Sequence, residues 1–273
     1  MRAKTFIPGA GLLVCMLALA SCETVQTTQP GAVGVERKQA MLLSSAQVDK
    51  SAALAYQQEM KKAASKKLLN QDPAQVARVR VIALRLIHVT SAFRADAPNW
   101  AWETNVITSK DVNAWCMPGG RMAVYTGLIE RLNVTDDELA AVMGHEIAHA
   151  LREHGRERAS QAAAQNILLG VAGAAVGLGG DSVRLAQIVT DVTINLPNSR
   201  EHEQEADRIG VELAARAGFD PRAAITLWQK MGKAGGGAPP EFLSTHPSSQ
   251  HRQQDLTEYA ARVMPLYEAT RKH

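Results

Sequence analysis

Cysteine, aromatic residues and excess charge are all scarce in this chain of 273 residues. Its three cysteines, Cys15, Cys22 and Cys116, are too few for the disulfide framework of a small secreted protein. Aromatic residues make up 4% of the sequence and the net charge is +3, which argues against a nucleic-acid partner. Hydrophobic residues make up 46% and charged residues 21%, a balance that excludes collagen, coiled-coil and wholly disordered chains. The composition therefore predicts one domain with a substantial hydrophobic core.

The hydrophobic runs are short as well. The first, over residues 6–20, follows two basic residues and ends in small residues, which is typical of a secretory signal rather than of a spanning helix of about 20 residues. The sequence Leu19-Ala20-Ser21-Cys22 resembles the box of bacterial lipoproteins. This resemblance implies that residues 1–21 are removed and that Cys22 becomes a lipidated N-terminus, which anchors the chain in a membrane. Because Glu23 is not the aspartate that retains lipoproteins in the inner membrane, the resemblance favours the outer membrane, facing the periplasm.

Two other segments have an unusual composition. Residues 22–35 are rich in Thr, Gln, Gly and Pro without periodicity, so they are expected to be a flexible tether, with residues 36–273 as the domain. Residues 167–178 are apolar and rich in Gly and Ala but too short to span a membrane. A buried packing helix is favoured there over an interfacial or lid-like segment.

Helical patterns dominate the remaining sequence. Ser44 with Gln47 has the spacing of a capping box, and Asp72 before Pro73 predicts the start of a second helix. Strand-like runs between residues 100 and 126, broken by a turn at 118–120, predict a small antiparallel sheet. The expected fold class is α+β, mainly helical with one small antiparallel sheet.

The motif His145-Glu146-Ile147-Ala148-His149 matches HExxH and falls on a predicted helix. Thr135 and Glu138 form the capping box that begins this helix. Histidines four residues apart lie on one helix face, close enough for both imidazoles to bind one zinc ion. Glu146 would lie beside the metal, where a carboxylate can take a proton from water.

A third ligand is needed, and it does not come from the same helix. A histidine in the HExxHxxGxxH register is excluded, because Arg152 and Gly155 occupy the glycine and histidine positions of that motif. Downstream, the segment Ser199–Asp207 is the only acidic cluster with a helical pattern, and Asn198 with Glu201 is expected to cap it.

Three glutamates of this cluster compete as the ligand. Glu203 has Asp207 one turn later on the same face, which provides a ligand together with a carboxylate that orients a histidine. Glu203 is therefore the candidate ligand and Asp207 its supporting acid. Glu201 and Glu205 are expected on the solvated surface, as in most charge runs.

These motifs together resemble the HtpX/CAAX-protease family of zinc metallopeptidases (peptidase M48 type), and more closely its outer-membrane lipoprotein and periplasmic members of the LoiP and BepA type. The similarity covers roughly residues 40–260. The matching residues are Asn113-Ala114, Pro118-Gly119-Gly120, Thr126-Gly127-Leu128, His145–His149, Ser199-Arg200 with Glu203 and Ala206-Asp207, and Thr245-His246-Pro247.

The resemblance implies a gluzincin-like domain that binds one zinc ion. His145, His149 and Glu203 would hold the metal, with Glu146 as the general base and Asp207 as the supporting acid. It also implies that residues 113–117 form an edge strand in which Asn113, Ala114 and Trp115 pair with the substrate backbone. Because no segment convincingly spans a membrane, a prenylated or intramembrane substrate is disfavoured.

His246 allows two roles near the metal. As a fourth ligand it would displace water and hold the enzyme latent; standing back, it could donate a hydrogen bond to the developing oxyanion. A structural histidine before Pro247 is the alternative.

Other residues near the motif are expected to be structural. His154, Glu157 and Arg158 have the spacing of ion pairs at i,i+3 or i,i+4. Cys116 lies in an apolar run without an adjacent base, so it is not expected to be a nucleophile.

The function expected from these features is a zinc endopeptidase that hydrolyses unfolded or misassembled cell-envelope proteins. An alternative is a chaperone or assembly factor for outer-membrane proteins in which His246 gates a latent zinc site. A zinc hydrolase that does not cut peptides is disfavoured by the strand and Pro-Gly-Gly turn beside the site.

Overall fold

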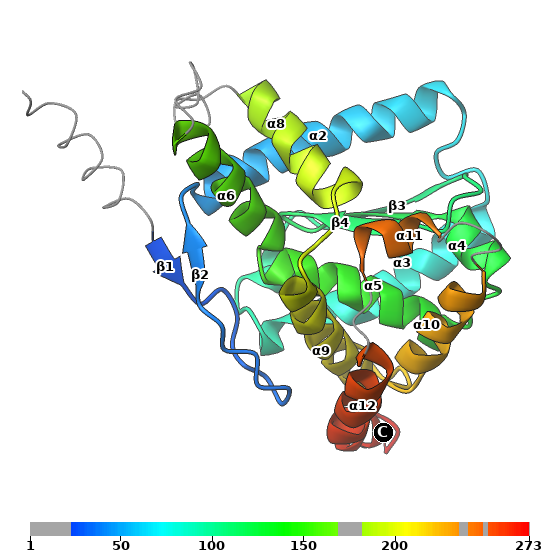
Figure 1. Cartoon of the computed structure of the whole chain (residues 1–273). Coiled ribbons are helices and arrows are strands. Elements are labelled where there is room, and N and C mark those ends of the chain that lie inside the picture. Colours follow the sequence, from blue (N-terminus) through cyan, green and yellow to red (C-terminus); the bar gives the residue numbers. More distant parts are fainter. Residues whose placement is uncertain (1–22, 169–181, 235–239, 248–250, 273) are drawn as a thin grey trace, which may run out of the picture.

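The computed structural model describes residues 23–168, 182–234, 240–247 and 251–272. The predicted signal segment, Cys22 and residues 169–178 of the apolar run lie outside these ranges. Within them the chain is mainly helical with two small sheets, which confirms the expected α+β class (Figure 1). None of the described helices is both long enough and apolar enough to cross a membrane.

The described elements fall into helices, one-turn helices and short strands. The α-helices are α2 (Ser45–Ser65), α3 (Pro73–His88), α4 (Thr126–Arg131), α5 (Asp136–Leu151), α6 (His154–Leu168), α8 (Ser182–Thr190), α9 (Arg200–Arg216), α10 (Ala223–Lys233), α11 (Glu241–Thr245) and α12 (Arg252–Thr270). The short helical turns are η1 (Thr90–Ala92), η2 (Ala97–Asn99) and the π-helical η3 (Asp191–Asn195). The strands are β1 (Glu23–Val25), β2 (Gln39–Met41), β3 (Glu103–Ile107), β4 (Ala114–Met117) and β5 (Arg121–Tyr125).

Local capping signals set the starts of three helices, as predicted. Ser44 and Gln47 form a complete capping box before α2, and Thr135 and Glu138 form another before α5. The side chain of Asp72 accepts hydrogen bonds from the first turn of α3. These contacts satisfy backbone amides that have no partner within the helix, so they fix where each helix begins.

The larger sheet is mixed rather than antiparallel. Its order is β3-β5-β4, with β5 antiparallel to β4 and parallel to β3. The tight turn after Met117 returns the chain directly, which pairs β5 with β4, and β3 then occupies the other side of β5. β4 is therefore an edge strand. A second sheet, not expected from the sequence, pairs β1 with β2.

The segment before α2 is well packed, in contrast to the flexible tether expected over residues 22–35. Val33 and Val35 are 1% and 3% exposed and belong to the main core. The amide of Gln29 donates to the carbonyl of Phe93 at 2.8 Å, and the amide of Val33 donates to Glu212 at 3.0 Å. The composition of the segment did not predict this order. Two valines and hydrogen-bond partners that are distant in sequence hold the segment in place, and it has no periodic hydrophobic pattern.

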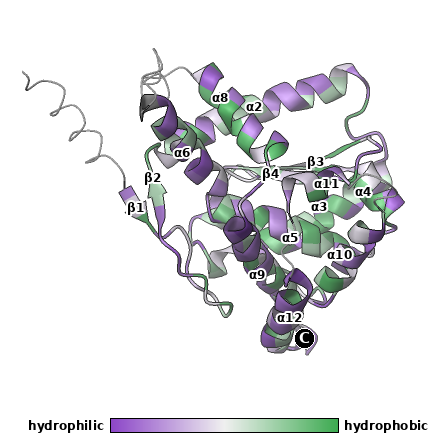
Figure 2. Ribbon diagram, viewed as in Figure 1, coloured by the Kyte–Doolittle hydropathy of each residue, from purple (hydrophilic) through white to green (hydrophobic). Residues whose placement is uncertain are grey.

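Helix α5 lies at the centre of the molecule. It packs against β4 and α3 on one side and against α9 on the other, with α10 and α12 completing the group (Figure 1). Hydrophilic residues cover much of the outlying α2, which packs on α8 (Figure 2). Helices α5 and α9 approach closely where Gly144 faces Gly210, since a Cβ added at Gly144 would lie 2.9 Å from the carbonyl oxygen of Gly210. This contact brings together the two helices that carry the HExxH motif and the acidic cluster.

Candidate metal centre

Three of the predicted ligands converge between α5 and α9. The Nε2 atoms of His145 and His149 lie 3.1 Å apart. The carboxylate of Glu203 has one oxygen 3.4 Å from the His145 Nε2 and the other 3.3 Å from the His149 Nε2. All three side chains are buried, and the Oε1 atom of Glu203 has no hydrogen-bond partner. Two imidazoles and a carboxylate that converge on one buried point fit a catalytic zinc site.

His246 is placed beside these residues by the short helix α11. Its ring stacks on Phe242, with centroids 4.1 Å apart, and its Nδ1 lies 3.1 Å from the carbonyl oxygen of Phe242. A proton on Nδ1 for that hydrogen bond leaves Nε2 with a free lone pair. The donor atoms of His246 and the three other residues all lie within 4.8 Å of one another. His246 can therefore act as a fourth ligand.

The carboxylate of Glu146 also faces the point where His145, His149 and Glu203 converge, but it is not placed as a metal ligand. Its Oε1 lies 3.4 Å from the Nε2 of His246 and has no hydrogen-bond partner. Burial raises the pKa of Glu146 to about 8, while the neighbouring charge of His145 and the backbone amide of Cys116 act in the opposite direction. A carboxylate whose pKa is close to neutral can both accept and return a proton.

The imidazole of His145 is oriented by Asp207, as the sequence spacing suggested. The Nδ1 of His145 lies 3.0 Å from the Oδ1 of Asp207, so a proton on Nδ1 directs Nε2 toward the cluster. Burial lowers the pKa of His145, but the Glu203 and Asp207 carboxylates outweigh it and raise this pKa to about 9. For His149, burial dominates and lowers the pKa to about 4.

Sequence reasoning missed Arg252, at the first position of α12. Its NH2 group donates to Asp207 at 2.7 Å and to Glu203 at 3.2 Å. The guanidinium is buried over the ring of Trp228, 3.3 Å from the centroid. This arrangement places one fixed positive charge against two acidic residues of the site. No local pattern marks it, since its partners lie 45 and 49 residues away.

Glu205 is buried, whereas the sequence indicated a surface position. It is 6% exposed, and it accepts hydrogen bonds from Arg152 and from Arg37. The prediction failed because other elements enclose α9 on several sides. Glu203 and Glu205 therefore both contact buried partners, although they point in different directions from the helix. Glu201, in contrast, is exposed as expected. The N-cap of α9 is Ser199, one residue later than predicted.

The residues that follow the motif have distant partners rather than the local ion pairs expected. His154 contacts His149 and Glu205 through its two ring nitrogens, and burial lowers its pKa well below the usual value. Glu157 accepts hydrogen bonds from Arg37 at 2.6 and 2.9 Å. Arg158 donates to the side chain of Asn198 and to three carbonyl groups of the segment before α9.

The predicted edge strand runs alongside the cluster. The carbonyl of Asn113 accepts from the amide of Tyr125 on β5, so alternation directs the backbone groups of Ala114 and Cys116 to the open edge. The amide of Cys116 interacts with Glu146, which shows that this edge faces the candidate base. The side chain of Trp115 is 2% exposed and packs edge-on against Tyr56, so it supports the strand from inside.

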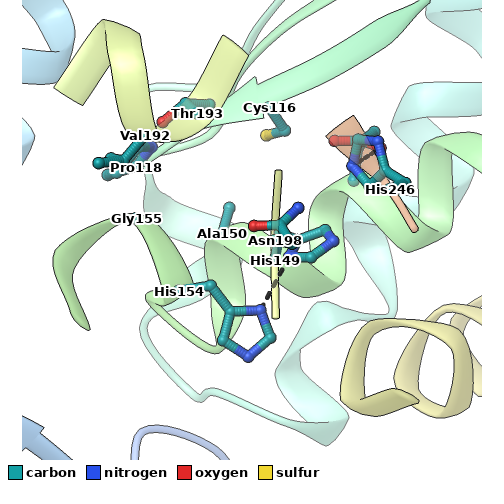
Figure 3. A pocket seen from close by; sticks show the side chains of 11 residues that line it. Cys116, Pro118, His149, Ala150, His154, Gly155, Val192, Thr193, Asn198 and His246 are labelled. Atoms are coloured by element: carbon teal, nitrogen blue, oxygen red, sulfur yellow. Dashed lines mark hydrogen bonds and ion pairs between the residues drawn. The ribbon is translucent and has the colours of Figure 1, made fainter. Parts of the chain in front are cut away.

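A pocket opens between β4, α5 and α6 and the segment before α9 (Figure 3). Figure 3 shows His149 between His154 on one side and His246 on the other. The thiol of Cys116 also lines the pocket; burial raises its pKa well above the usual value, which does not favour a nucleophilic role. Polar and small side chains share the lining, which consists of Cys116, Pro118, Glu146, His149, Ala150, His154, Gly155, Val192, Thr193, Asn198 and His246.

Comparisons with known proteins agree with this geometry. The chain is 39% identical to the mitochondrial metalloendopeptidase OMA1 of Arabidopsis thaliana over 158 residues, which are 58% of this chain and 31% of that protein. It is 29% identical to the metalloprotease LoiP of Escherichia coli over 250 residues, 90% of this chain and 94% of LoiP. It is 28% identical to the β-barrel assembly-enhancing protease of Escherichia coli over 210 residues, 72% of this chain and 41% of that protein.

The OMA1 relatives are longer proteins, and the chain spans between 31% and 58% of their length. The model of peptidase family M48 matches residues 73–260, which include every residue of the metal cluster. Zinc is the metal that this family uses, and the cluster of two or three imidazoles and one carboxylate suits it. The chain therefore belongs to peptidase family M48.

Proposed function

We propose that this protein is a zinc-dependent endopeptidase that hydrolyses peptide bonds of unfolded or misassembled cell-envelope proteins. One observation carries the proposal: a buried glutamate whose pKa is raised to about 8 faces the point where His145, His149 and Glu203 converge. That combination is what metal-assisted hydrolysis requires. The names of the relatives reported above, which are a metalloendopeptidase, a metalloprotease and a protease, support the same class of reaction.

Each residue of the site has a distinct task in this reaction. Zinc bound by His145, His149 and Glu203 supplies Lewis-acid chemistry. Glu146 takes a proton from the attacking water and returns it to the leaving amine. Asp207 holds the ring of His145 with Nε2 toward the metal, and it is held in turn by Arg252.

The open edge of β4 gives the substrate its position. An extended peptide that adds to this edge as a further strand would pair with the backbone of Ala114 and Cys116, next to Glu146. Pairing through the main chain reads any extended segment, which suits unfolded substrates. The side chain of Asn113 accepts a hydrogen bond from the amide of Ala114 at 2.9 Å, so it must turn away before the substrate can use that amide.

We place the protein in the cell envelope, anchored in the outer membrane through lipid on Cys22 and facing the periplasm. The lipoprotein-like sequence before Cys22 supports this location, as does a relative whose name refers to β-barrel assembly. A Cys22→Ala variant should lose incorporation of a labelled fatty acid and appear in the water-soluble fraction. Labelling that persists in this variant contradicts the anchor.

A second candidate function is a chaperone or assembly factor whose protease activity is latent. The observation in its favour is the position of His246, whose Nε2 shares the space of the other donors. A histidine that ligates the metal closes the site to water. Degradation of casein and of denatured porin by the wild type and by His246→Ala separates the two functions. Faster cleavage by the variant supports a latent site, whereas slower cleavage assigns His246 to the reaction itself.

The proposed peptidase is tested most directly with Glu146→Gln. The variant should bind zinc with the wild-type stoichiometry and cleave casein at least 100-fold more slowly, because general-base catalysis contributes a factor of about 10² to 10⁴. Glu201→Gln is the matched control, since Glu201 is exposed on the neighbouring helix, and it should keep both zinc and activity. Cleavage by Glu146→Gln at the wild-type rate would show that the base is misassigned.

A further inference from the structure

Three buried side chains, those of His149, His154 and Glu205, form a series of hydrogen bonds that leads away from the metal cluster on the side opposite His246. The Nδ1 of His149 lies 2.8 Å from the Nδ1 of His154 (Figure 3). The Nε2 of His154 lies 2.9 Å from the Oε2 of Glu205. These contacts connect α5, α6 and α9. His154 is 1% exposed and Glu205 is 6% exposed, so the contacts are shielded from water.

The chemistry of imidazole fixes the direction of each hydrogen bond in this series. The Nε2 of His149 points toward His145 and Glu203, so a metal bound there uses Nε2 and leaves the proton on Nδ1. That proton is donated to His154, whose Nδ1 must then accept. A neutral His154 carries its own proton on Nε2, where the Glu205 carboxylate accepts it. Only one pair of tautomers satisfies both bonds.

Glu205, the last residue of this hydrogen-bond series, is held by two arginines. Arg152 donates to the two oxygens of Glu205 at 3.0 and 3.1 Å, and Arg37 donates to them at 2.8 and 3.1 Å. Arg152 is fully buried, and Arg37 comes from the packed segment before α2. Charge-assisted, two-pronged hydrogen bonds of this kind restrict both position and rotation of a carboxylate. Glu205 is therefore a fixed acceptor.

We infer that His154 is a positioning residue for the metal site. It holds His149 in the tautomer and orientation that bind zinc, and Glu205 in turn fixes His154. The inference rests on the proposed function, because it takes His149 as a zinc ligand. It assigns the two histidines of the motif different supports: His145 has a carboxylate directly, and His149 has one through an intervening imidazole. Removal of such supporting partners typically weakens metal binding by about 10-fold to 100-fold.

The choice of variants separates positioning from simple filling of space. His154→Phe keeps an aromatic ring that fills at least the space of the imidazole but removes the acceptor, whereas His154→Asn loses volume but its side-chain oxygen can take the place of Nδ1. The inference expects zinc affinity to fall by about 10-fold to 100-fold in the Phe variant and by less in the Asn variant. A residue that only fills space would give the opposite order.

His202→Phe is the matched control. His202 is also buried, at 4% exposed against 1% for His154, and stacks on it with centroids 4.3 Å apart, but its Nε2 contacts Glu157 rather than a ligand. Phenylalanine at this position keeps the stacked ring, so zinc affinity should stay within about 2-fold of wild type, well below the loss expected from a supporting residue. Loss of affinity in this control equal to that in His154→Phe would overturn the assignment to His154.

The experiment measures zinc dissociation constants of the whole chain without residues 1–21, by competition with a fluorescent chelator. Circular dichroism of the metal-free proteins first establishes that each variant is folded. Should His154→Phe fail to fold, His154→Asn and Glu205→Gln decide the matter: affinity unchanged in both overturns the inference. Should wild type bind no zinc, or His149→Ala bind it as well as wild type, the proposed function fails instead, and the two failures are thereby distinguished.

Discussion

A single methyl group between α5 and α9 should damage both the stability and the metal site. A Cβ added at Gly210 would lie 2.7 Å from the backbone nitrogen of His145 and 2.9 Å from its Cα. Ordinary contact begins at 3.4 Å, so Gly210→Ala requires the helices to separate by about 0.7 Å at this point. Because the opposing atoms belong to the backbone, no side-chain rotation can relieve the clash.

Two effects of opposite sign contribute to the stability of Gly210→Ala. Alanine is favoured over glycine within a helix by about 1 kcal/mol. Overpacking of a close-packed interior costs about 1 to 3 kcal/mol, and here both sides of the contact are rigid. We therefore expect a net loss of about 1 kcal/mol, which corresponds to a melting temperature lower by about 2 to 4 °C in a chain of this size.

The effect on zinc should be larger, because the ligands come from both helices. His145 is the very residue that the new methyl group contacts, while Glu203 moves with α9. Metal–ligand distances tolerate changes of about 0.2 Å, so a separation several times larger should weaken zinc binding by at least about 10-fold. Denaturant titration of the metal-free protein and zinc competition measure the two effects separately.

Gly232→Ala is the matched control for this prediction. Gly232 lies in α10, and a Cβ added there meets nothing within 4 Å. The same substitution should stabilise the protein by up to about 0.5 kcal/mol, since only helix propensity changes near this helix end. The reasoning is refuted if Gly210→Ala is as stable as Gly232→Ala and binds zinc as tightly as wild type.

Three further predictions concern charge and metal. Burial opposes ionisation of Glu157, but Arg37 and His202 outweigh it and hold its pKa below the usual value; the resulting stability is present above about pH 4.5 and is lost as pH falls toward the lower, folded-state pKa. Arg37→Met should therefore be less stable at neutral pH and unfold at a higher pH in acid titrations followed by circular dichroism; an unchanged acid midpoint would contradict this. Removal of zinc by a chelator should lower the melting temperature by roughly 5 to 10 °C, because a ligand at 100 times its dissociation constant stabilises by about 2.7 kcal/mol; identical melting curves would argue against a bound metal. Arg252→Met should destabilise the metal-free protein more than the zinc form, since zinc compensates the Glu203 charge once Arg252 is gone; equal losses in both forms would show that the guanidinium acts through packing alone.

Features encoded by neighbouring residues were predictable from the sequence. The capping boxes at Ser44 and Thr135 involve residues three positions apart, and HExxH places two histidines on one turn. Glu203 could be selected because Asp207 follows it within the same helix. In each case the physics is local, so a short stretch of sequence contains all the partners.

Features that depend on the tertiary arrangement were not predictable in the same way. Glu205 was expected in solvent, yet its partners Arg37, Arg152 and His154 lie between 51 and 168 residues away along the chain. Arg252 was missed for the same reason. The order of the sheet also escaped prediction, because strand-like runs reveal their own length but not which neighbours they will pair with.

The packing of the first described residues has a consequence for how far the catalytic centre can operate from a bilayer. Strand β1 begins at Glu23, directly after the cysteine that we propose to be acylated. One extended residue spans only about 3.4 Å, so acyl chains there would hold the folded domain against the lipid headgroups. The domain would have no long flexible linker on which to move away from the membrane. Polypeptides would then be cut only while they are at the membrane surface. Their distance from the membrane would therefore contribute to substrate selection.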